Sequence, residues 1–376
     1  MSMNETSINF RNFSIKELFR EADRALADGK NTLIIITSSR AEAFGMTEML
    51  SAWKEMPNVF HYPVVDPNPS VQSLTAALNA VRDFSPGRII VFGGGSAIDT
   101  AKGISALLPL MTEDVSADQV RDWINTKAYK EENPACEIIA IPTTAGSGSD
   151  VTQWATIWDP EKHQKLSVDD PGLKPAQSLF CAELHTTMPV RLTLSTGLDA
   201  LSHAMEAFWA KAHTGTSRQN ALAAVAGIAA VLPEVLRAPD SAELRTRMGL
   251  HVMEASLAFS ETRTTACHSI SYPLTMRYGI QHGFACALTL HPVALRNLAV
   301  CPEIATLLEP FGDADGFAAW LEAVTAGIQP LRLSAWNVPA ADIPEIAREA
   351  FTKGRMDNNP VPFTEADVQE ILKEVW

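Results

Sequence analysis

Short hydrophobic runs alternate with helix-length segments through the first half of the chain. The runs are rich in β-branched residues and lie at 32–37, 61–65, 88–92 and 137–142. Helical patterns fill the intervals, up to about Glu55 and again at 70–84. This alternation is typical of βαβ units and predicts a parallel β-sheet covered by helices. The segment 154–168 is expected to add a short hairpin.

After Pro189 the pattern changes to long runs rich in alanine and leucine, such as 220–236 and 242–259. These runs have helical length, and strand signals are scarce from there to the C-terminus. The sequence therefore predicts an α/β domain at 1–187 and an all-helical domain at 188–376. The boundary is expected to be a turn, with the two domains packed closely.

Composition narrows the class of protein. The chain has 376 residues, of which 46% are hydrophobic, enough for packed cores in two domains. Lys and Arg total 30 against 44 Asp and Glu, a formal net charge of −14. This balance argues against nucleic acids and anionic membranes as partners, but it does not exclude a small anionic substrate.

The cysteines and the first residues bear on the compartment. Five cysteines, an odd number without CxxC spacing, lie mostly in apolar runs and indicate reduced, buried thiols. The first residues, MSMNETSINFRNFSIKEL, lack a basic head followed by a long apolar core, and we expect no apolar run near 18 residues. A cytoplasmic, non-membrane protein is expected.

The segment 194–209, LSTGLDALSHAMEAFW, carries the first candidate chemistry. A turn at Thr196–Gly197 is expected to open into a helix, on which Asp199 and His203 are four residues apart and share a face. With His268 and His282 they would make a site of one carboxylate and three imidazoles. Such ligands suit Fe(II), Zn(II), Ni(II) or Mn(II). The alternative is that these are hydrogen-bonded core histidines.

Two glycine- and hydroxyl-rich motifs follow predicted strands. In VFGGGSAIDTAKG, at 91–103, glycines and a helix N-terminus could approach phosphate oxygens. It is not the GxGxxG fingerprint, because Ile98 stands at the last glycine position, and a plain tight turn is the alternative. In IPTTAGSGSDVT, at 141–152, hydroxyl groups could bind a ligand at the carboxyl edge of the sheet, or the loop could be a solvated turn.

Taken together, GGGSAIDTAK, PTTAGSGSDVT, Lys165, STGLDALSHAMEAF and the paired His268 and His282 resemble the group III, iron-dependent alcohol dehydrogenase family, from about residue 32 to 297. The resemblance implies a dehydroquinate synthase-like fold, with a nicotinamide-dinucleotide-binding α/β domain, a helical metal-binding domain and an active site between them. Its metal, Fe(II) or Zn(II), would be bound by Asp199, His203, His268 and His282. The coenzyme site would comprise Asn68, Gly94, Gly95, Ser96, Asp99, Thr143, Thr144, Ser147, Thr152 and Lys165.

Three departures from the family pattern change these expectations. The acidic residue that commonly follows the first strand is replaced by Ser38, Ser39 and Arg40, which favours NADP(H) and leaves NAD(H) open. The usual GTGSE reads GSGSD. Tyr272 stands where most members have a histidine, so it is a candidate proton donor, with bulk water, a ribose hydroxyl or a merely structural tyrosine as alternatives.

The implied reaction is hydride transfer between a nicotinamide and a small aldehyde or alcohol. The segment 259–290 resembles the phosphonoacetaldehyde reductases, which make 2-hydroxyethylphosphonate. Arg263 and Arg277 are candidates for the phosphonate, or else form internal salt bridges to Glu206, Glu254 or Glu261. The alternatives are a general aldehyde or polyol dehydrogenase, or a non-catalytic metal- and nucleotide-binding protein. A homodimer stays open.

Overall fold

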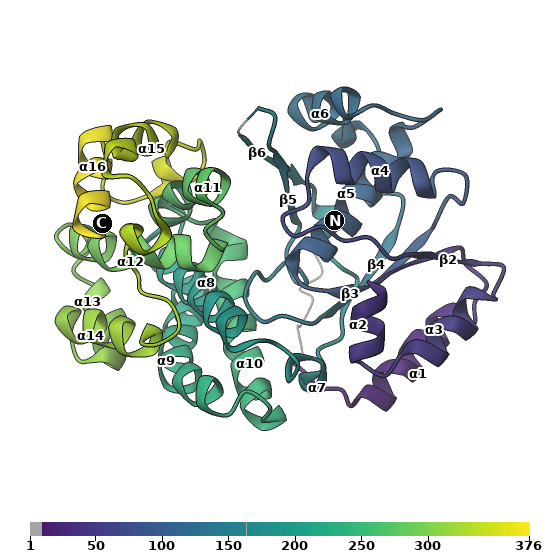
Figure 1. Ribbon diagram of the computed structural model, residues 1–376, viewed down its shortest axis with the longest axis horizontal. Coiled ribbons are helices and arrows are strands. Elements are labelled where there is room, and N and C mark those ends of the chain that lie inside the picture. Colours follow the sequence, from purple (N-terminus) through teal and green to yellow (C-terminus); the bar gives the residue numbers. More distant parts are fainter. Residues whose placement is uncertain (1–9, 163) are drawn as a thin grey trace.

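A computed structural model describes residues 10–162 and 164–376, so the sequence expectation for the first nine residues lies outside it. The chain folds into an α/β half and a helical half that lie side by side (Figure 1). This is the predicted fold class. The predicted boundary after residue 187 falls between α7 (Ala182–His185) and α8 (Val190–Trp209).

The α/β half is built on a five-stranded sheet of order β2-β1-β3-β4-β7, with every neighbouring pair parallel. Four strands lie within three residues of their predicted bounds, whereas the two-residue β7 was not foreseen. Their bounds are β1 (Thr32–Ile35), β2 (Val59–Tyr62), β3 (Arg88–Gly93), β4 (Glu137–Pro142) and β7 (Gln177–Ser178).

Helices cover both faces of this sheet, because alternate residues of its central strands point to opposite sides. Ile34 and Ile90 face α1, α2 and α3, whereas Leu33 and Ile89 face α4, α5 and α6. All four side chains are fully buried. The helices are α1 (Ile15–Leu26), α2 (Ser38–Ala43), α3 (Thr47–Lys54), α4 (Val71–Val81), α5 (Gly95–Leu107) and α6 (Ala117–Thr126).

The predicted hairpin is present as the antiparallel pair β5 (Trp154–Asp159) and β6 (Gln164–Asp169). Figure 1 shows it reaching toward α11 of the helical half. The Trp158 and Tyr272 rings meet edge to face, with centroids 6.2 Å apart, and so join the hairpin to that helix.

The helical half packs around one continuous apolar core, as predicted from its alanine- and leucine-rich runs. Among the described residues only α9 is long and apolar enough to cross a membrane, and it packs against α8 and α10. The helices are α8, α9 (Gly215–Arg237), α10 (Ala242–Thr262), α11 (Ala266–Tyr278), α12 (His282–Leu298), α13 (Ile304–Leu308), α14 (Ala314–Thr325), α15 (Ile343–Glu349) and α16 (Glu365–Glu374).

The expected turn at Thr196–Gly197 is wrong, since α8 runs unbroken from Val190 to Trp209. Gly197 has a packing role instead. A Cβ added there would lie 2.6 Å from Leu232 Cδ1, so the glycine lets α8 approach α9 closely. The five cysteines carry no disulfide, as expected, although Cys301 is only partly buried.

Candidate metal centre and binding cleft

A cleft of about 590 Å³ is lined by both halves of the protein. From the α/β half come the ends of β1, β3 and β4 and the start of α5; from the helical half come α8, α11 and α12. Carboxyl strand ends and a helix N-terminus are common places for ligands in open parallel sheets. Of the predicted site residues, all line this cleft except Ser38, Ser39 and Arg277.

Helix α8 places Asp199 and His203 one turn apart on its cleft side, and both side chains are buried. The His203 ring stacks on Phe259, with centroids 4.1 Å apart, and on His268, at 4.5 Å. Burial lowers the pKa of His203 to about 3, so its imidazole is neutral. Burial opposes ionisation of Asp199, but the nearby imidazoles of His203 and His282 outweigh it and lower the pKa of the carboxyl.

The carboxylate of Glu206 fixes His268 at the start of α11. It accepts hydrogen bonds from His268 Nδ1, from the backbone N–H of Cys267 at 2.7 Å and from Thr265 Oγ1 at 2.8 Å. Thr265, at the N-cap, supplies no side-chain cap, so Glu206 satisfies the free N–H groups of the helix. With Nδ1 engaged, His268 turns its Nε2 toward Asp199 Oδ1, 3.5 Å away.

His282 reaches the same point from the first residue of α12, with Nε2 3.8 Å from Asp199 Oδ1. The next residue makes this approach feasible. A Cβ added to Gly283 would overlap the carbonyl oxygen of Ser195 on α8, so only a glycine lets the two helices meet here.

Cys286 lies one turn after His282, with its Sγ 3.9 Å from His282 Nε2. Asp199, His268, His282 and Cys286 form a cluster whose ligand atoms all lie within 4.8 Å of one another. Burial would raise the pKa of the thiol, but positive charge on His268 and His282 lowers it. The cluster therefore has the predicted Asp199, His268 and His282 together with a sulfur that the sequence prediction did not include.

Two buried atoms of this cluster, Asp199 Oδ1 and His268 Nε2, have no hydrogen-bond partner among the described residues. The same holds for Nδ1 of His203, a predicted ligand that stacks on His268 but lies outside the cluster. Unpaired buried acceptors are costly, and one carboxylate oxygen with several imidazole nitrogens is a common donor set for a divalent transition metal. The residues present therefore fit a metal ion.

Opposite this cluster, Gly94 is the N-cap of α5 and supplies no side-chain cap. The glycines admit the neighbouring loop. A Cβ at Gly94 would lie 2.7 Å from Thr144 Oγ1, and one at Gly95 would lie 2.6 Å from Ser147 Oγ. An uncapped helix start among hydroxyl groups suits the pyrophosphate of a dinucleotide.

Asp99 holds the hydroxyl-rich loop in place. Its Oδ1 accepts from Ser149 Oγ at 2.6 Å, and its Oδ2 accepts from the backbone N–H of Thr156 at 3.0 Å. The buried Lys102 Nζ donates to Ser149 O at 2.6 Å and to Trp154 O at 2.8 Å. Both oxygens of Asp99 thus position the loop, and the contact of Asp99 with the coenzyme stays a prediction.

The same loop also contacts the helical half. A Cβ at Gly146 would lie 2.7 Å from the carbonyl oxygen of Thr196 on α8. Gly148 has φ +61° and leaves a Cβ no room beside Ser256 on α10. The loop is therefore fitted between the sheet and two helices.

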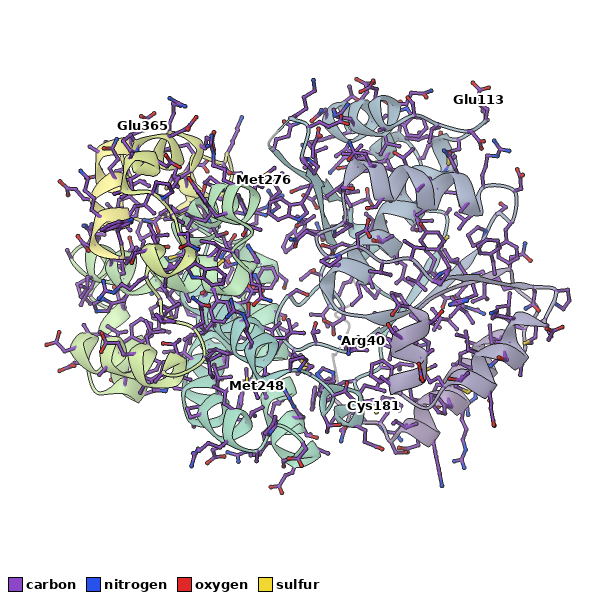
Figure 2. The ribbon with its side chains drawn as sticks, viewed as in Figure 1. Arg40, Glu113, Cys181, Met248, Met276 and Glu365 are labelled. Atoms are coloured by element: carbon purple, nitrogen blue, oxygen red, sulfur yellow. The ribbon has the colours of Figure 1, made fainter. Side chains whose placement is uncertain are left out.

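The predicted adenosine end is only partly as expected. Arg40 lines the cleft from α2 (Figure 2), and it forms no ion pair with residues 10–162 or 164–376. Ser38 and Ser39 lie in the first turn of α2, outside the cleft lining. Asn68, whose φ is +55°, lines the cleft, and its backbone N–H donates to Ser96 Oγ at 3.1 Å.

Tyr272 and Lys165 face each other across the two halves. Lys165 Nζ donates to the Tyr272 hydroxyl at 2.9 Å and lies 4.3 Å from the centre of its ring. Burial would raise the pKa of Tyr272, but the charges of Lys165 and Arg355 bring it down to about 7. The Tyr272 ring also lies parallel to that of His282, with centroids 6.1 Å apart.

The two arginines predicted to bind substrate have acidic partners, although not those considered from the sequence. Arg263 Nη2 pairs with Asp169 Oδ2 at 2.6 Å at the cleft rim. Arg277 pairs with Glu349 at 2.6 Å and Glu345 at 3.0 Å, outside the cleft lining. Arg277 is therefore not positioned to contact a ligand, because α15 holds its side chain.

Sequence reasoning missed Glu206 as a positioning residue and Cys286 as a cluster member. Both have a helical signal. Glu206 follows His203 by three residues on α8, and Cys286 follows His282 by four on α12, so each shares a face with a predicted ligand.

Comparisons with known proteins agree with this geometry. Residues 6–180 match the iron-containing alcohol dehydrogenase family, and residues 193–376 match the C-terminal Fe-containing alcohol dehydrogenase family. Phosphonoacetaldehyde reductase from Streptomyces viridochromogenes is 33% identical over 324 residues, which cover 81% of this chain and 79% of that protein. NAD-dependent methanol dehydrogenase from Bacillus methanolicus is 27% identical over 359 residues, 92% of each chain.

Among solved structures, sulfoacetaldehyde reductase from Bifidobacterium kashiwanohense in complex with NAD+ matches with a TM-score of 0.84 at 27% identity. The match covers 98% of this chain and 96% of that one. The similarity therefore extends over both halves and the cleft between them.

Proposed function

The chain belongs to the iron-containing alcohol dehydrogenase family, and we propose that it reduces phosphonoacetaldehyde to 2-hydroxyethylphosphonate with NADPH. One observation carries the oxidoreductase chemistry. Asp199 Oδ1 and His268 Nε2 are buried without a hydrogen-bond partner among the described residues, and they share a cleft with the uncapped start of α5. The proposed metal ligands and the proposed pyrophosphate site would thus share one cleft, which supports a nicotinamide-dependent reductase.

Asp199, His203, His268 and His282 are the proposed metal ligands, with Cys286 beside them. The bound Fe(II) or Zn(II) would supply Lewis-acid polarisation of the aldehyde carbonyl. Glu206 accepts the hydrogen bond from Nδ1 of His268, which leaves the lone pair of Nε2 free to bind a metal. The N-terminus of α5 and the loop 143–152 would hold the coenzyme pyrophosphate.

Tyr272 is the proposed proton donor to the developing alkoxide. It is buried, its ring centroid lies 6.1 Å from that of His282, and its hydroxyl accepts a hydrogen bond from Lys165. A coenzyme ribose hydroxyl and bulk water are the alternatives. Tyr272→Phe distinguishes them, since a strong loss of kcat with an unchanged KM for coenzyme supports the tyrosine.

The phosphonate part of the proposal is supported by the 33% identical relative. The coenzyme choice is supported by Arg40, which lines the cleft without an ion pair among the described residues. A general aldehyde or polyol dehydrogenase on the same scaffold is the second candidate, supported by the similarity to a methanol dehydrogenase.

The test is oxidation of NADH and NADPH by protein loaded with Fe(II) or Zn(II), with phosphonoacetaldehyde and simple aldehydes as substrates. We expect turnover, highest with phosphonoacetaldehyde, and its loss together with the metal in His268→Ala. A full equivalent of metal in that variant would refute the ligand assignment. No turnover with any aldehyde would leave a non-catalytic binding protein.

A further inference from the structure

Four basic side chains line the cleft, and their partners differ: Arg40, Lys165, Arg263 and Arg355. Arg40 lies on α2, toward the proposed adenosine end. The other three lie near Tyr272 or the hairpin. Arg263 is neutralised by Asp169, 2.6 Å away. The two that are left, Lys165 and Arg355, form no ion pair with residues 10–162 or 164–376.

Arg355 is the less satisfied of the two. Among the described residues its buried Nε has no hydrogen-bond partner, and its Nη1 donates to the carbonyl oxygen of the preceding Gly354, at 3.1 Å. A guanidinium held in a partly buried site without a carboxylate is costly. It is therefore expected to have an anionic partner that the protein does not supply.

The backbone around Arg355 is held firmly beside the site. The side-chain amide of Asn358 donates to the carbonyl oxygens of Thr262 at 2.9 Å and Thr264 at 3.2 Å. The backbone N–H of Thr352 donates to Ser269 Oγ on α11, at 3.0 Å. Arg355 is thus fixed against the segment that leads into α11, which carries both His268 and Tyr272.

Lys165 and Arg355 line the same cleft as Tyr272. Lys165 donates to the Tyr272 hydroxyl, and the segment that carries Arg355 is bonded to α11 through Thr352 and Ser269. The Tyr272 ring lies parallel to that of His282, so Lys165 stands about one aromatic ring away from the metal cluster, and Arg355 lines the same cleft. A short aldehyde with an anionic group at its other end could span that separation.

We propose that Arg355, assisted by Lys165, binds the tetrahedral oxyanion head group of the substrate, a phosphonate or sulfonate one carbon from the aldehyde. This inference rests on the proposed function, because it names the residues that recognise one part of that substrate. The guanidinium fork takes two oxygens, and the ammonium takes a third. It replaces Arg263 and Arg277 as the substrate-binding arginine.

The first test measures binding without turnover. Methylphosphonate and methanesulfonate carry the two head groups but cannot react, and their affinity for metal-loaded protein is measured by calorimetry. Arg355→Met should weaken methylphosphonate binding about 10- to 150-fold. The control is Arg247→Met, which removes an exposed arginine on α10 that is paired with Glu234 on α9, and this variant should bind like wild type. If the wild-type protein binds neither compound, the proposal that Arg355 and Lys165 bind the head group is wrong.

The second test compares kcat/KM for phosphonoacetaldehyde, sulfoacetaldehyde and propanal. Arg355→Met should lose about 10- to 150-fold on the charged aldehyde that wild type prefers, and far less on propanal. The kcat/KM of Arg355→Lys on that aldehyde should lie between those of wild type and Arg355→Met, since the positive charge is kept but the bidentate guanidinium is lost. The preferred charged aldehyde identifies the head group.

The outcomes separate the two proposals. Equal losses on charged and uncharged aldehydes would show that Arg355 serves the coenzyme or the fold. They would contradict head-group binding by Arg355 and leave the proposed reductase activity standing. Wild-type reduction of propanal in preference to both charged aldehydes would do the same. If no aldehyde is reduced, the proposed function is wrong. The binding of methylphosphonate then tests head-group binding by Arg355 independently of turnover.

Discussion

Glu206 on α8 accepts a hydrogen bond from Nδ1 of His268 on α11, and both side chains are almost fully buried. The same carboxylate accepts from the backbone N–H of Cys267. One acidic residue therefore caps a helix and sets the tautomer and orientation of a proposed metal ligand.

Replacing Glu206 with Gln should weaken metal binding about 10- to 100-fold, because the amide offers one acceptor oxygen in place of two. Metal affinity is measured by competition with a chelator. The control is Glu254→Gln, which removes a carboxylate paired with His251 at 2.9 Å outside the cleft. Wild-type affinity in Glu206→Gln would show that the hydrogen bond does not position His268.

Gly283→Ala should destabilise the protein by about 1–3 kcal/mol and weaken metal binding. The added methyl would meet the backbone of Ser195, which cannot move aside as a flexible side chain can. Urea unfolding and metal content are the measurements. Gly215→Ala is the matched control, because nothing lies within 4 Å of a Cβ there. Equal stability in both variants would contradict the close helix contact.

Cys286 should act as a sulfur ligand when the site is loaded with Co(II). Its Sγ belongs to the cluster with Asp199, His268 and His282. We expect a thiolate-to-cobalt charge-transfer band in the near ultraviolet, absent from Cys286→Ser and retained in Cys301→Ser. A band of unchanged intensity in Cys286→Ser would exclude the thiol as a ligand.

Arg40→Ala should lower kcat/KM for NADPH about tenfold or more while changing that for NADH far less. The reason is loss of a charge-assisted contact to the 2′-phosphate. Arg24→Ala, at an exposed arginine paired with Glu21 on α1, is the control. A strong preference of wild type for NADH would end the NADPH proposal.

His185 should make stability depend on pH. Burial lowers its pKa from 6.5 to about 4, so between these values the unfolded chain binds more protons than the folded one. The free energy of unfolding therefore falls as the pH drops from 6.5 to 4, and His185 accounts for about 3 kcal/mol of that fall. Below pH 4 the contribution of His185 no longer changes. The free energy of unfolding of His185→Gln, measured with denaturant, should depend less on pH over this range than that of wild type. Equal pH dependence in the two proteins would contradict the role of His185.

The sequence could predict the features that depend on local spacing. Asp199 and His203 lie four apart in a strongly helical segment, so their shared face follows from helix geometry. The strands were recognisable because β-branched runs alternate with helix-length segments. The single helix through Thr196–Gly197 was not, since the glycine marks close packing on Leu232 of α9 rather than a turn.

Features that depend on contacts between distant segments could not be predicted. Arg263 is paired with Asp169, 94 residues away on the hairpin, whereas the candidates from the sequence were nearby glutamates and Glu206. Arg355 lies outside regular helix, so no period marks it. Which arginine has no acidic partner is decided by how the hairpin, α11 and the C-terminal segment come together.

The loop 143–152 leaves the sheet but is fitted to the helices, through Gly146 against Thr196 and Gly148 against Ser256. This matters for engineering by exchange of halves between relatives. A chimera joined at a single crossover near residue 188 would pair the loop of one parent with α8 and α10 of the other. Carrying Thr196 and Ser256 with the loop would keep the fit, so coenzyme preference is better exchanged together with these two helix positions.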